Sequence, residues 1–476
     1  MSRLKIAIVP MLLTKDRSFY QASYQRFMVP LGPIALASYV ESLNLPVDIL
    51  VHDQIETVLH FKPDVVGISS VSENFGHAQN IAKLLKETIR PFVIIGGPHF
   101  TSMPDFLPDC FDAGVVGEGE LVLGNILSKF LEKGVSKEHL KGIPGLVLKY
   151  DGQLTPPTRA PQIEKLDVLP MPHRKPWVRH LGLPHIMTTR GCVYSCFFCA
   201  EPTLFKGYRQ FSPERIVEEI ENILTDYPAT THVRFYDDIF PVNLRRLREL
   251  CDLMEKRKIP ERASFSCFIH AKLVNEEVVS LLKRMNFIFV QFGAETGSPK
   301  LLKQIKPASS VELNQKAINL FHRHGIQIGL TFIVGTPEET PEDLKKTYQF
   351  IKKNRDKLID VEISPAVALP GTSLWETAVK RNLIPKPEEM NWEVFRDSAN
   401  LKEFDLDRYI YLADQVPPDF FLSMLHKFSK LVEEIQRLNG TEKFLRENYL
   451  AGYIPVSFRS PRFDEEKTGH NRTKAN

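Results

Sequence analysis

The stretch Arg190-Gly-Cys-Val-Tyr-Ser-Cys-Phe-Phe-Cys-Ala200 brings Cys192, Cys196 and Cys199 together in one short segment. Three thiolates so close can hold one iron–sulfur cluster, and a cubane cluster has four irons that expect four ligands. With only three ligands supplied, one iron stays open, as catalytic metal sites generally leave one position free. Zinc sites usually pair two Cys/His clips, and the sequence downstream has no second clip. Three buried core thiols are the alternative, but the bulky phenylalanines between them favour a loop folded round a cluster.

Length and composition describe a soluble globular protein of two to three domains, since the chain has 476 residues, 43% of them hydrophobic and 25% charged. A net charge of +3 argues against nucleic acid or an anionic membrane as partner. No apolar run is long enough to span a bilayer. The opening apolar run Lys5–Val9 is short and stops at Pro10, so it predicts a first strand rather than a signal peptide. Clustered cysteines favour a reducing cytoplasm.

Residues 1–135 alternate short apolar runs with amphipathic stretches, which predicts a five-stranded parallel, doubly wound sheet. The expected helices include Ile34–Leu43 and His77–Ile89. The expected strands are Lys5–Val9, Val47–Val51, Val65–Ser69, Phe92–Gly96 and Asp112–Val116. Ligands of such sheets bind beyond the carboxyl ends of the strands.

Those strand ends carry serines and glycines. Glycine lets the backbone approach a large planar or phosphate-bearing ligand, and serine hydroxyls can bond amides or phosphate. Glycines that merely make turns are the alternative. The candidate binding residues are Ser69, Ser70, Ser72, Gly96, Gly97, Pro98, His99, Gly117, Gly119 and Glu120.

A linker over residues 136–183, with one short strand at Gly145–Leu148, leads to a second region of strand–helix alternation over 184–376. Serine or threonine followed by proline, as at Ser212 and Thr340, predicts helix starts. Six β/α units predict a partial parallel barrel, whose reactive residues gather at the carboxyl ends of its strands. The expected strands are Pro184–Thr189, His232–Tyr236, Ala263–Ile269, Phe287–Phe292, Gln327–Val334 and Val361–Leu369.

Beyond the barrel, residues 377–460 are expected to form a helical cap with helices near Phe420–Leu438 and Glu442–Tyr449. A cap over the barrel would set substrate specificity. The polar end of mixed charge, residues 461–476, is expected to be disordered.

The cysteine spacing, with an aromatic residue before the last cysteine, resembles the signature of the radical S-adenosylmethionine (SAM) superfamily. The resemblance implies that the amine and carboxylate of SAM occupy the open iron, and that electron transfer releases a 5′-deoxyadenosyl radical. It also implies a SAM contact at Phe198 and agrees with the partial barrel.

Further SAM contacts are implied at later strand ends. Asp237 and Asp238 stand where the family places its amine-binding motif, although a capping role for Asp238 is equally open. Glu295 would accept the ribose hydroxyls, since a carboxylate has two oxygens, and Val334 with Gly335 would lie beside adenine.

Residues 4–130 resemble the cobalamin-binding domain fused ahead of many radical SAM enzymes, most specifically in Gly96-Gly-Pro-His99 and Gly117-Glu-Gly-Glu120. The resemblance implies cobalamin as a third cofactor beside a 4Fe-4S cluster and SAM. The chain has no Asp-x-His-x-x-Gly after the first strand. No lower axial histidine can therefore be assigned, and loss of cobalamin, known among related domains, stays an alternative.

We therefore expect a cytoplasmic cobalamin-dependent radical SAM methyltransferase. It would act on an unactivated carbon, less readily phosphorus, of a small molecule or lipid, with flavodoxin or ferredoxin as electron donor. A radical SAM cyclase or oxidase without methyl transfer is the alternative, and a non-catalytic sensor a distant one. Among the other cysteines, a catalytic thiol at Cys267 is a minor possibility, whereas Cys110 and Cys251 are expected to be buried.

Overall fold

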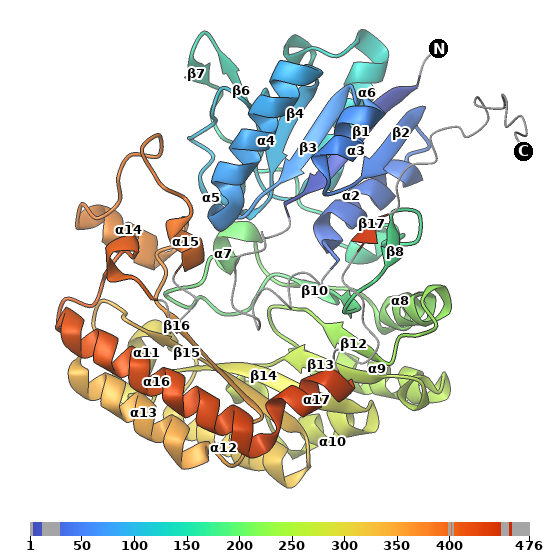
Figure 1. Cartoon of the computed structure of the whole chain (residues 1–476). Coiled ribbons are helices and arrows are strands. Elements are labelled where there is room, and N and C mark those ends of the chain that lie inside the picture. The colour runs from blue at the N-terminus through green and yellow to red at the C-terminus, as the bar shows by residue number, and fades with distance from the viewer. Residues whose placement is uncertain (1–2, 12–28, 398–400, 402–403, 449–456, 459–476) are drawn as a thin grey trace, which may run out of the picture.

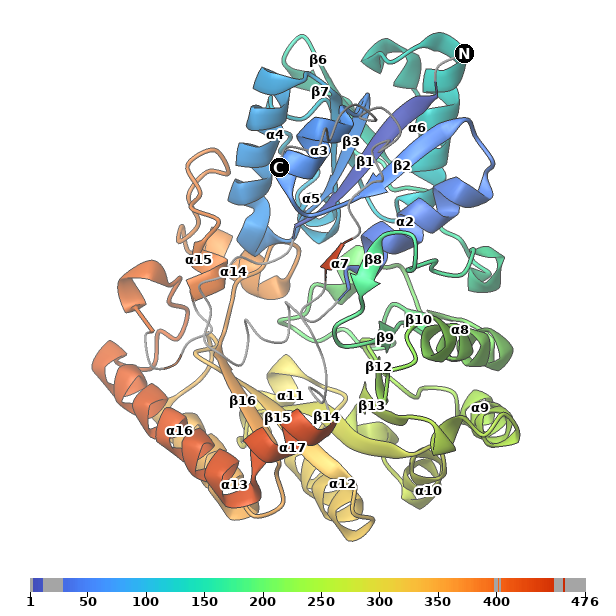
Figure 2. The ribbon, with the colours of Figure 1, turned by 45° about the vertical axis from the view of Figure 1, so that its right-hand side comes forward.

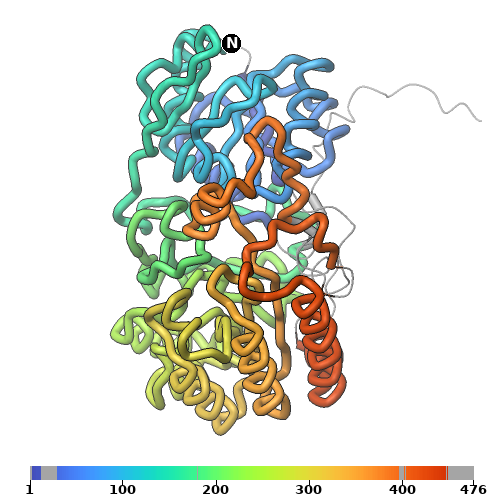
Figure 3. Tube along the Cα trace, turned by 90° about the vertical axis from the view of Figure 1, so that its left-hand side faces the viewer, coloured from blue at the N-terminus to red at the C-terminus, as the bar shows by residue number. Residues whose placement is uncertain are grey.

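The structure is a computed structural model that describes residues 3–11, 29–397, 401, 404–448 and 457–458. It has two lobes, each built round one main β-sheet (Figure 1). Turned views show the N-terminal lobe stacked on the C-terminal one (Figure 2, Figure 3). Among the described residues, no helix is both long and apolar enough to cross a bilayer.

Five parallel strands form the centre of the N-terminal sheet, in the order β2-β1-β3-β4-β5. The strands are β1 (Leu4–Pro10), β2 (Val47–Val51), β3 (Val65–Ser69), β4 (Phe92–Gly96) and β5 (Ala113–Val115). Alternation along β1 directs Ile6 and Ile8 to one face, under α2 and α6, and Ala7 and Val9 to the other, under α3 and α4. The helices are α2 (Leu31–Ser42), α3 (Ile55–Phe61), α4 (Phe75–Thr88), α5 (Pro98–Ser102) and α6 (Glu120–Lys133). Both faces are covered, so the predicted doubly wound architecture is confirmed.

The sheet has seven strands instead of the five predicted, because a hairpin of β6 (Leu146–Tyr150) and β7 (Gln153–Leu154) extends it antiparallel beyond β5. The two turn residues, Asp151 and Gly152, both have positive φ, the conformation that Asp-Gly favours in a tight hairpin. Burial of the apolar residues of β6 completes the edge of the sheet. Part of the predicted linker therefore belongs to the first lobe.

The C-terminal sheet has six strands in the order β16-β15-β14-β13-β12-β9, and every neighbouring pair is parallel. The strands are β9 (His185–Ile186), β12 (His232–Phe235), β13 (Ser264–Phe268), β14 (Phe287–Glu295), β15 (Gln327–Val334) and β16 (Asp360–Pro365). Strand order follows chain order, as a partial barrel of successive β/α units requires.

Helices cover the outside of this sheet (Figure 1). They are α8 (Pro213–Asp226), α9 (Leu244–Lys256), α10 (Glu276–Arg284), α11 (Pro299–Ile305), α12 (Val311–Arg323) and α13 (Pro341–Asn354). The two predicted starts are N-caps, because the hydroxyl of Ser212 accepts from Arg215 N–H and that of Thr340 accepts from Asp343 N–H.

The last described helices are α14 (Ser373–Lys380), α15 (Val394–Asp397), α16 (Pro418–Asn439) and α17 (Thr441–Asn448), and β17 (Ser457–Phe458) pairs with β8 (Val178–His180). The predicted cap position of α16 is wrong, since the helix packs beside α13 on the outer face of β16 (Figure 1). Its apolar stripe, from Phe421 to Ile435, needs a sheet face to cover it. The segment before α16 instead reaches the first lobe, where Met390, Trp392 and Phe395 join the core. The predicted tail, residues 461–476, lies outside the described residues.

Candidate active site

The three cysteines lie on a loop after β9 whose two ends are joined by a short antiparallel pair. We call residues 191–208 the cluster loop, and the pair β10 (Thr189–Arg190) with β11 (Arg209–Gln210) its neck. Gly191 has φ +87°, and a Cβ atom there would lie 1.9 Å from the carbonyl oxygen of Gly207. Only glycine therefore allows the two sides of the loop to meet. All three cysteines are free thiols and half-buried.

The structure does not gather the three sulfurs of the cluster loop round a single metal-ion position. Only one set of three ligand atoms among the described residues lies within 4.8 Å of one another, and it belongs to Cys251, Asp252 and Glu255. The sulfurs of the cluster loop are therefore more spread than a tetrahedral zinc site, with Zn–S bonds of about 2.3 Å, would hold them. The Cys251 set is an ion-pair site, since Arg284 binds both of its carboxylates.

Burial raises the pKa of the Cys196 thiol to about 11 and that of Cys199 to about 12. Metal binding requires the thiolate, so a cluster would displace these protons. The backbone N–H of Glu201 donates to Cys199 Sγ at 3.5 Å, and this hydrogen bond favours the thiolate. The loop then turns into α7 (Glu201–Leu204). Phe198, a predicted SAM contact, packs with Phe197 against the buried residues after β16.

The structure gives Asp237 a role other than the predicted SAM contact. Its carboxylate is fully buried and accepts four hydrogen bonds of 2.6–2.8 Å, from the backbone N–H and hydroxyl groups of Thr188 and Thr189. Burial raises its pKa to about 6, against the effect of these donors. Asp237 therefore fixes the strand end that leads into the cluster loop and offers no free oxygen for an amine.

Asp238 remains as an amine acceptor, and it has a partner that the sequence did not reveal. Glu201 is buried, its Oε1 atom has no hydrogen-bond donor among the described residues, and its carboxyl group interacts with that of Asp238. Desolvation, followed by the neighbouring carboxyl group, raises the pKa of Glu201. Desolvation also raises the pKa of Asp238. Two acids beside the cysteines form a site that a cation would stabilise. The only sequence signal for Glu201 was its place just after Cys199.

Glu295 ends β14 in a left-handed conformation, φ +61°, which is uncommon for a residue other than glycine and often marks a functional position. Lys306 Nζ donates to Glu295 Oε1 at 2.9 Å and to the carbonyl oxygen of Gly293 at 2.7 Å. One carboxylate oxygen is thereby held, and the other has no protein donor in the described structure. Glu295 can bind one ribose hydroxyl through that oxygen, where the prediction gave it both.

Val334 ends β15 and Gly335 follows with φ +86°. A Cβ atom on Gly335 would lie 3.0 Å from the ring of Phe421 and 3.3 Å from Tyr409 Oη, so the turn is already crowded from the C-terminal segment. Gly335 N–H donates to Glu339, a buried carboxyl whose pKa is raised to about 8 by desolvation. The predicted adenine contact at this turn remains a prediction.

The other predicted thiol, Cys267, lies in the apolar core and is 1% exposed. Its strand neighbours point the opposite way, where Ser266 bonds His232 and the ring of Phe268 lies 4.4 Å from the Arg234 guanidinium. Burial raises the Cys267 thiol pKa strongly, so the catalytic role considered for it has no support in the geometry.

A donor without a described acceptor lies beside the cluster loop, at His270. The ring packs 4.3 Å from that of Tyr194, and Nδ1 accepts from Lys272 N–H at 3.1 Å. Burial lowers the imidazole pKa to about 3, so the single proton must sit on Nε2, which is buried without a hydrogen-bond partner. The sequence had not marked this residue.

A cavity of about 290 Å³ lies between the lobes, at the carboxyl ends of β1, β3, β4 and β5. Its wall includes Met187, Phe205 and Phe211 from the C-terminal lobe. Seven of the ten residues predicted to bind cobalamin line it, namely Ser69, Gly96, Gly97, Pro98, Gly117, Gly119 and Glu120. Gly97, with φ +91°, approaches the backbone of Ser70 so closely that a Cβ atom would lie 2.8 Å from its carbonyl oxygen.

The other three predicted residues do not line the cavity. Ser70 Oγ donates to the carbonyl oxygen of Val71, and Ser72 Oγ bonds His99 Nδ1 at 3.0 Å. The His99 ring packs against Phe75 at 3.8 Å, and burial lowers its pKa to about 3. These side chains bond or pack within the first lobe instead of lining the cavity, because strand ends are identifiable from sequence but the direction of each side chain in the following turn is not.

Comparison with known proteins agrees with both halves of the site. The family model of the radical SAM superfamily matches residues 186–351, and that of the B12 binding domain matches residues 20–127. A methyltransferase-named relative from Pyrococcus horikoshii is 31% identical over 83% of this chain and 88% of its own. The chain belongs to the radical SAM superfamily. Its resemblance to the B12-binding members of this superfamily, predicted from the cysteine and glycine motifs, is confirmed.

Two further proteins are similar to this chain. The anaerobic magnesium-protoporphyrin IX monomethyl ester cyclase of Rubrivivax gelatinosus is 27% identical over 64% of this chain and 57% of its own. The radical SAM methyltransferase TsrM from Kitasatospora setae, solved with cobalamin and a [4Fe-4S] cluster, superposes with TM-score 0.71 over 95% of this chain and 100% of TsrM. At 19% identity this likeness concerns the fold of both lobes.

Proposed function

We propose that this radical SAM protein is a cobalamin-dependent methyltransferase that acts on an unactivated carbon, less readily phosphorus, of a small molecule or lipid. We place it in the cytoplasm, with flavodoxin or ferredoxin as electron donor. When bound, the cluster would supply the electron that cleaves SAM, and cobalamin would carry the methyl group.

One observation carries this proposal. The cavity assigned to cobalamin is walled by both lobes, and Arg190, two residues before the first cysteine, belongs to its wall. The strand ends of the first lobe and the cluster loop of the second therefore face the same junction. A shared junction is what transfer between two cofactors and one substrate requires, because the reacting groups must be held close and in line.

The residues of the chain would divide the work of positioning. Cys192, Cys196 and Cys199 would hold the cluster. Asp238 and Glu201 would receive the SAM amine, since a cation stabilises two neighbouring carboxyl groups. The remaining contacts would come from Glu295 and Lys306 at the ribose edge, from Gly335 at adenine, and from Gly97, Gly117 and Gly119 at the cobalamin face.

The cyclase alternative has one specific support, the similarity to a cyclase. The methyltransferase reading is favoured because the methyltransferase-named relative is more similar and matches over most of both chains. A cyclase needs only the radical, whereas a methyltransferase of this type consumes SAM in two ways.

Anaerobic turnover with methyl-labelled SAM and an extract of the source organism separates the two. A methyltransferase should label one product and release S-adenosylhomocysteine and 5′-deoxyadenosine in about equal amounts. Deoxyadenosine without labelled product or S-adenosylhomocysteine would establish the non-methylating alternative. No SAM cleavage at all under reducing conditions would favour a sensor.

A further inference from the structure

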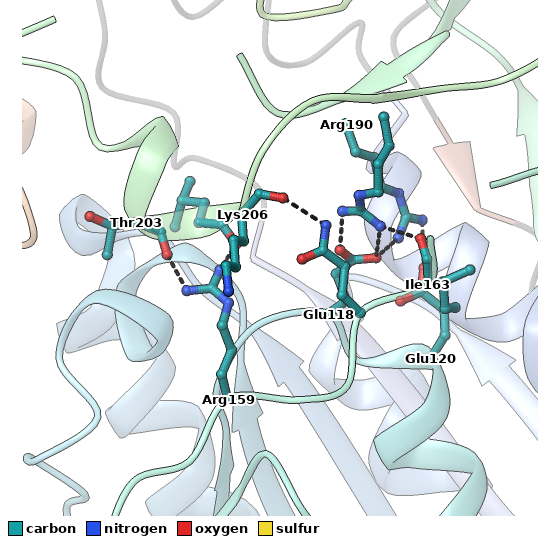
Figure 4. Close-up of polar contacts among 10 residues, drawn as sticks. Glu118, Glu120, Arg159, Ile163, Arg190, Thr203 and Lys206 are labelled. Carbon is teal, nitrogen blue, oxygen red and sulfur yellow. Dashed lines mark hydrogen bonds and ion pairs between the residues drawn. The ribbon is translucent and has the colours of Figure 1, made fainter. Parts of the chain in front are cut away.

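The neck of the cluster loop is held by the first lobe. Arg190 and Arg209 stand opposite each other in the β10–β11 pair, and both bind Glu118, which follows β5 of the N-terminal sheet. Arg190 Nη1 donates to Glu118 Oε2 at 2.5 Å, and Arg209 Nη2 donates to Glu118 Oε1. One carboxylate therefore joins the two ends of the loop that carries the cysteines (Figure 4).

The network is compact and balanced in charge. Arg190 Nη2 donates to Glu120 Oε1 at 2.6 Å, so two arginines face two glutamates. Side-chain exposure is between 6% and 14% for all four residues, and water therefore screens these charges little. Arg209 is further oriented by donating to the carbonyl oxygen of Ile163 at 2.5 Å.

A second set of contacts ties the same loop to the residues that follow the N-terminal sheet. Arg159 donates to the carbonyl oxygens of Thr203, at 2.8 Å, and Leu204. Gln162 donates to the carbonyl oxygen of Lys206 at 2.7 Å (Figure 4). The stretch between Cys199 and the neck is thus held by side chains from outside its own lobe.

The loop that provides Glu118 is also a wall of the cobalamin cavity. Gly117 and Gly119 line that cavity, as do Glu118, Glu120 and Arg190. Gly117 has φ +94°, and a Cβ atom there would lie 3.3 Å from the side chain of Arg159. A group that fills the cavity would therefore contact the same short segment whose carboxylates form ion pairs with the neck of the cluster loop.

We infer that Glu118 is a positioning residue that links the two cofactor sites, so that order in the cluster loop and affinity for cobalamin depend on each other. This inference rests on the proposed function. Linkage is reciprocal, so the factor by which an assembled cluster raises the affinity for cobalamin equals the factor by which cobalamin raises the affinity for the cluster. Allosteric couplings of this kind are typically about 5- to 150-fold.

The test is a titration of the full-length protein with hydroxocobalamin, followed by absorbance, in the reconstituted form and after removal of iron by a chelator. In the wild type, Kd for cobalamin should be at least about five-fold lower with the cluster present. In Glu118→Gln, which keeps the size of the side chain but removes its charge, the ratio of the two Kd values should approach one. Arg209→Gln should act in the same direction, since it removes the same contact from the other side.

Asp112→Asn is the matched control. Asp112 is a half-buried carboxylate of the same lobe that binds Lys86 and accepts from Val93 N–H at 2.6 Å, without contact to the cluster loop. It should lower stability yet preserve the wild-type ratio of Kd values. Equal cobalamin affinity of the two wild-type forms would overturn the linkage and leave the proposed function standing. Failure of the wild type to bind cobalamin in either form would overturn both.

Discussion

Gly97 offers a sharp test of the cobalamin cavity, because another glycine of the same lobe has nearly the same backbone conformation. Gly97 has φ 91° and ψ −172°, and Gly134, at the end of α6, has φ 89° and ψ 163°. Both lie in a region that is essentially restricted to glycine, so alanine at either position should cost about 1–3 kcal/mol of folding free energy. The two substitutions are thus matched in backbone strain.

They differ in what the new methyl group meets. At Gly97 it would lie 2.8–2.9 Å from Ser70 backbone atoms and Ser69 Oγ, and at Gly134 nothing lies within 4 Å. Forcing an atom into such a contact adds roughly 1–3 kcal/mol and displaces the neighbours. Since Ser69 and Gly97 both line the cavity, Gly97→Ala should also weaken cobalamin binding, and Gly134→Ala should not.

Urea unfolding gives the two free energies, and absorbance titration with hydroxocobalamin gives the two affinities. The expected order of destabilisation is Gly97→Ala greater than Gly134→Ala, with loss of affinity in the first variant alone. Equal destabilisation together with wild-type affinity in both variants would refute the close approach at Gly97 and its place in the cavity.

Further predictions follow from the cysteines and from buried histidine. Cys196→Ala should remove the 4Fe-4S absorbance and EPR signal together with SAM cleavage, since two ligands cannot hold a cubane, whereas Cys110→Ala should leave both unchanged; a full cluster in Cys196→Ala would disprove the ligand set. Because burial lowers the pKa of His99 to about 3, the unfolded chain binds a proton below pH 6.5 that the folded chain does not. Stability should therefore fall as pH drops from about 6.5 toward 3, by up to about 1.4 kcal/mol per pH unit from this residue. His99→Phe should show a shallower fall in urea unfolding between pH 7 and 5, and an unchanged slope would contradict the buried neutral imidazole.

Much of the fold was predictable because the periodicity of apolar residues and the positions of turn and capping residues are local features of the sequence. Both sheets, the central strands of each and the N-caps at Ser212 and Thr340 followed from such signals, whereas the order β2-β1-β3-β4-β5 is known only from the structure. The Asp151-Gly152 hairpin was also marked locally, but it was placed in a linker because its strand pairs with β5, far back in the chain. The position of α16 depends on its packing against β16 and α13, and no local sequence pattern indicates which elements a helix will pack against.

The site was predictable in its cysteines and strand ends, and less so in its side chains. Asp237 and Asp238 are adjacent at a strand end, so their side chains point in opposite directions. Only the structure shows that Asp237 is the buried one. Glu118 and Arg190 are 72 positions apart, and their pairing is a tertiary contact between lobes. Such contacts form when the two lobes pack together, and a local sequence pattern in either lobe does not indicate them.

The central claim, that one chain holds a cluster and cobalamin at a shared junction, is tested most directly by metal content. Protein reconstituted anaerobically with iron, sulfide and hydroxocobalamin, then freed of unbound reagents, should contain about four irons and one cobalt per chain, as one cubane and one corrin require. Four irons without cobalt would show that the N-terminal lobe does not bind cobalamin. Cobalt without iron would contradict the cluster on which the whole account depends.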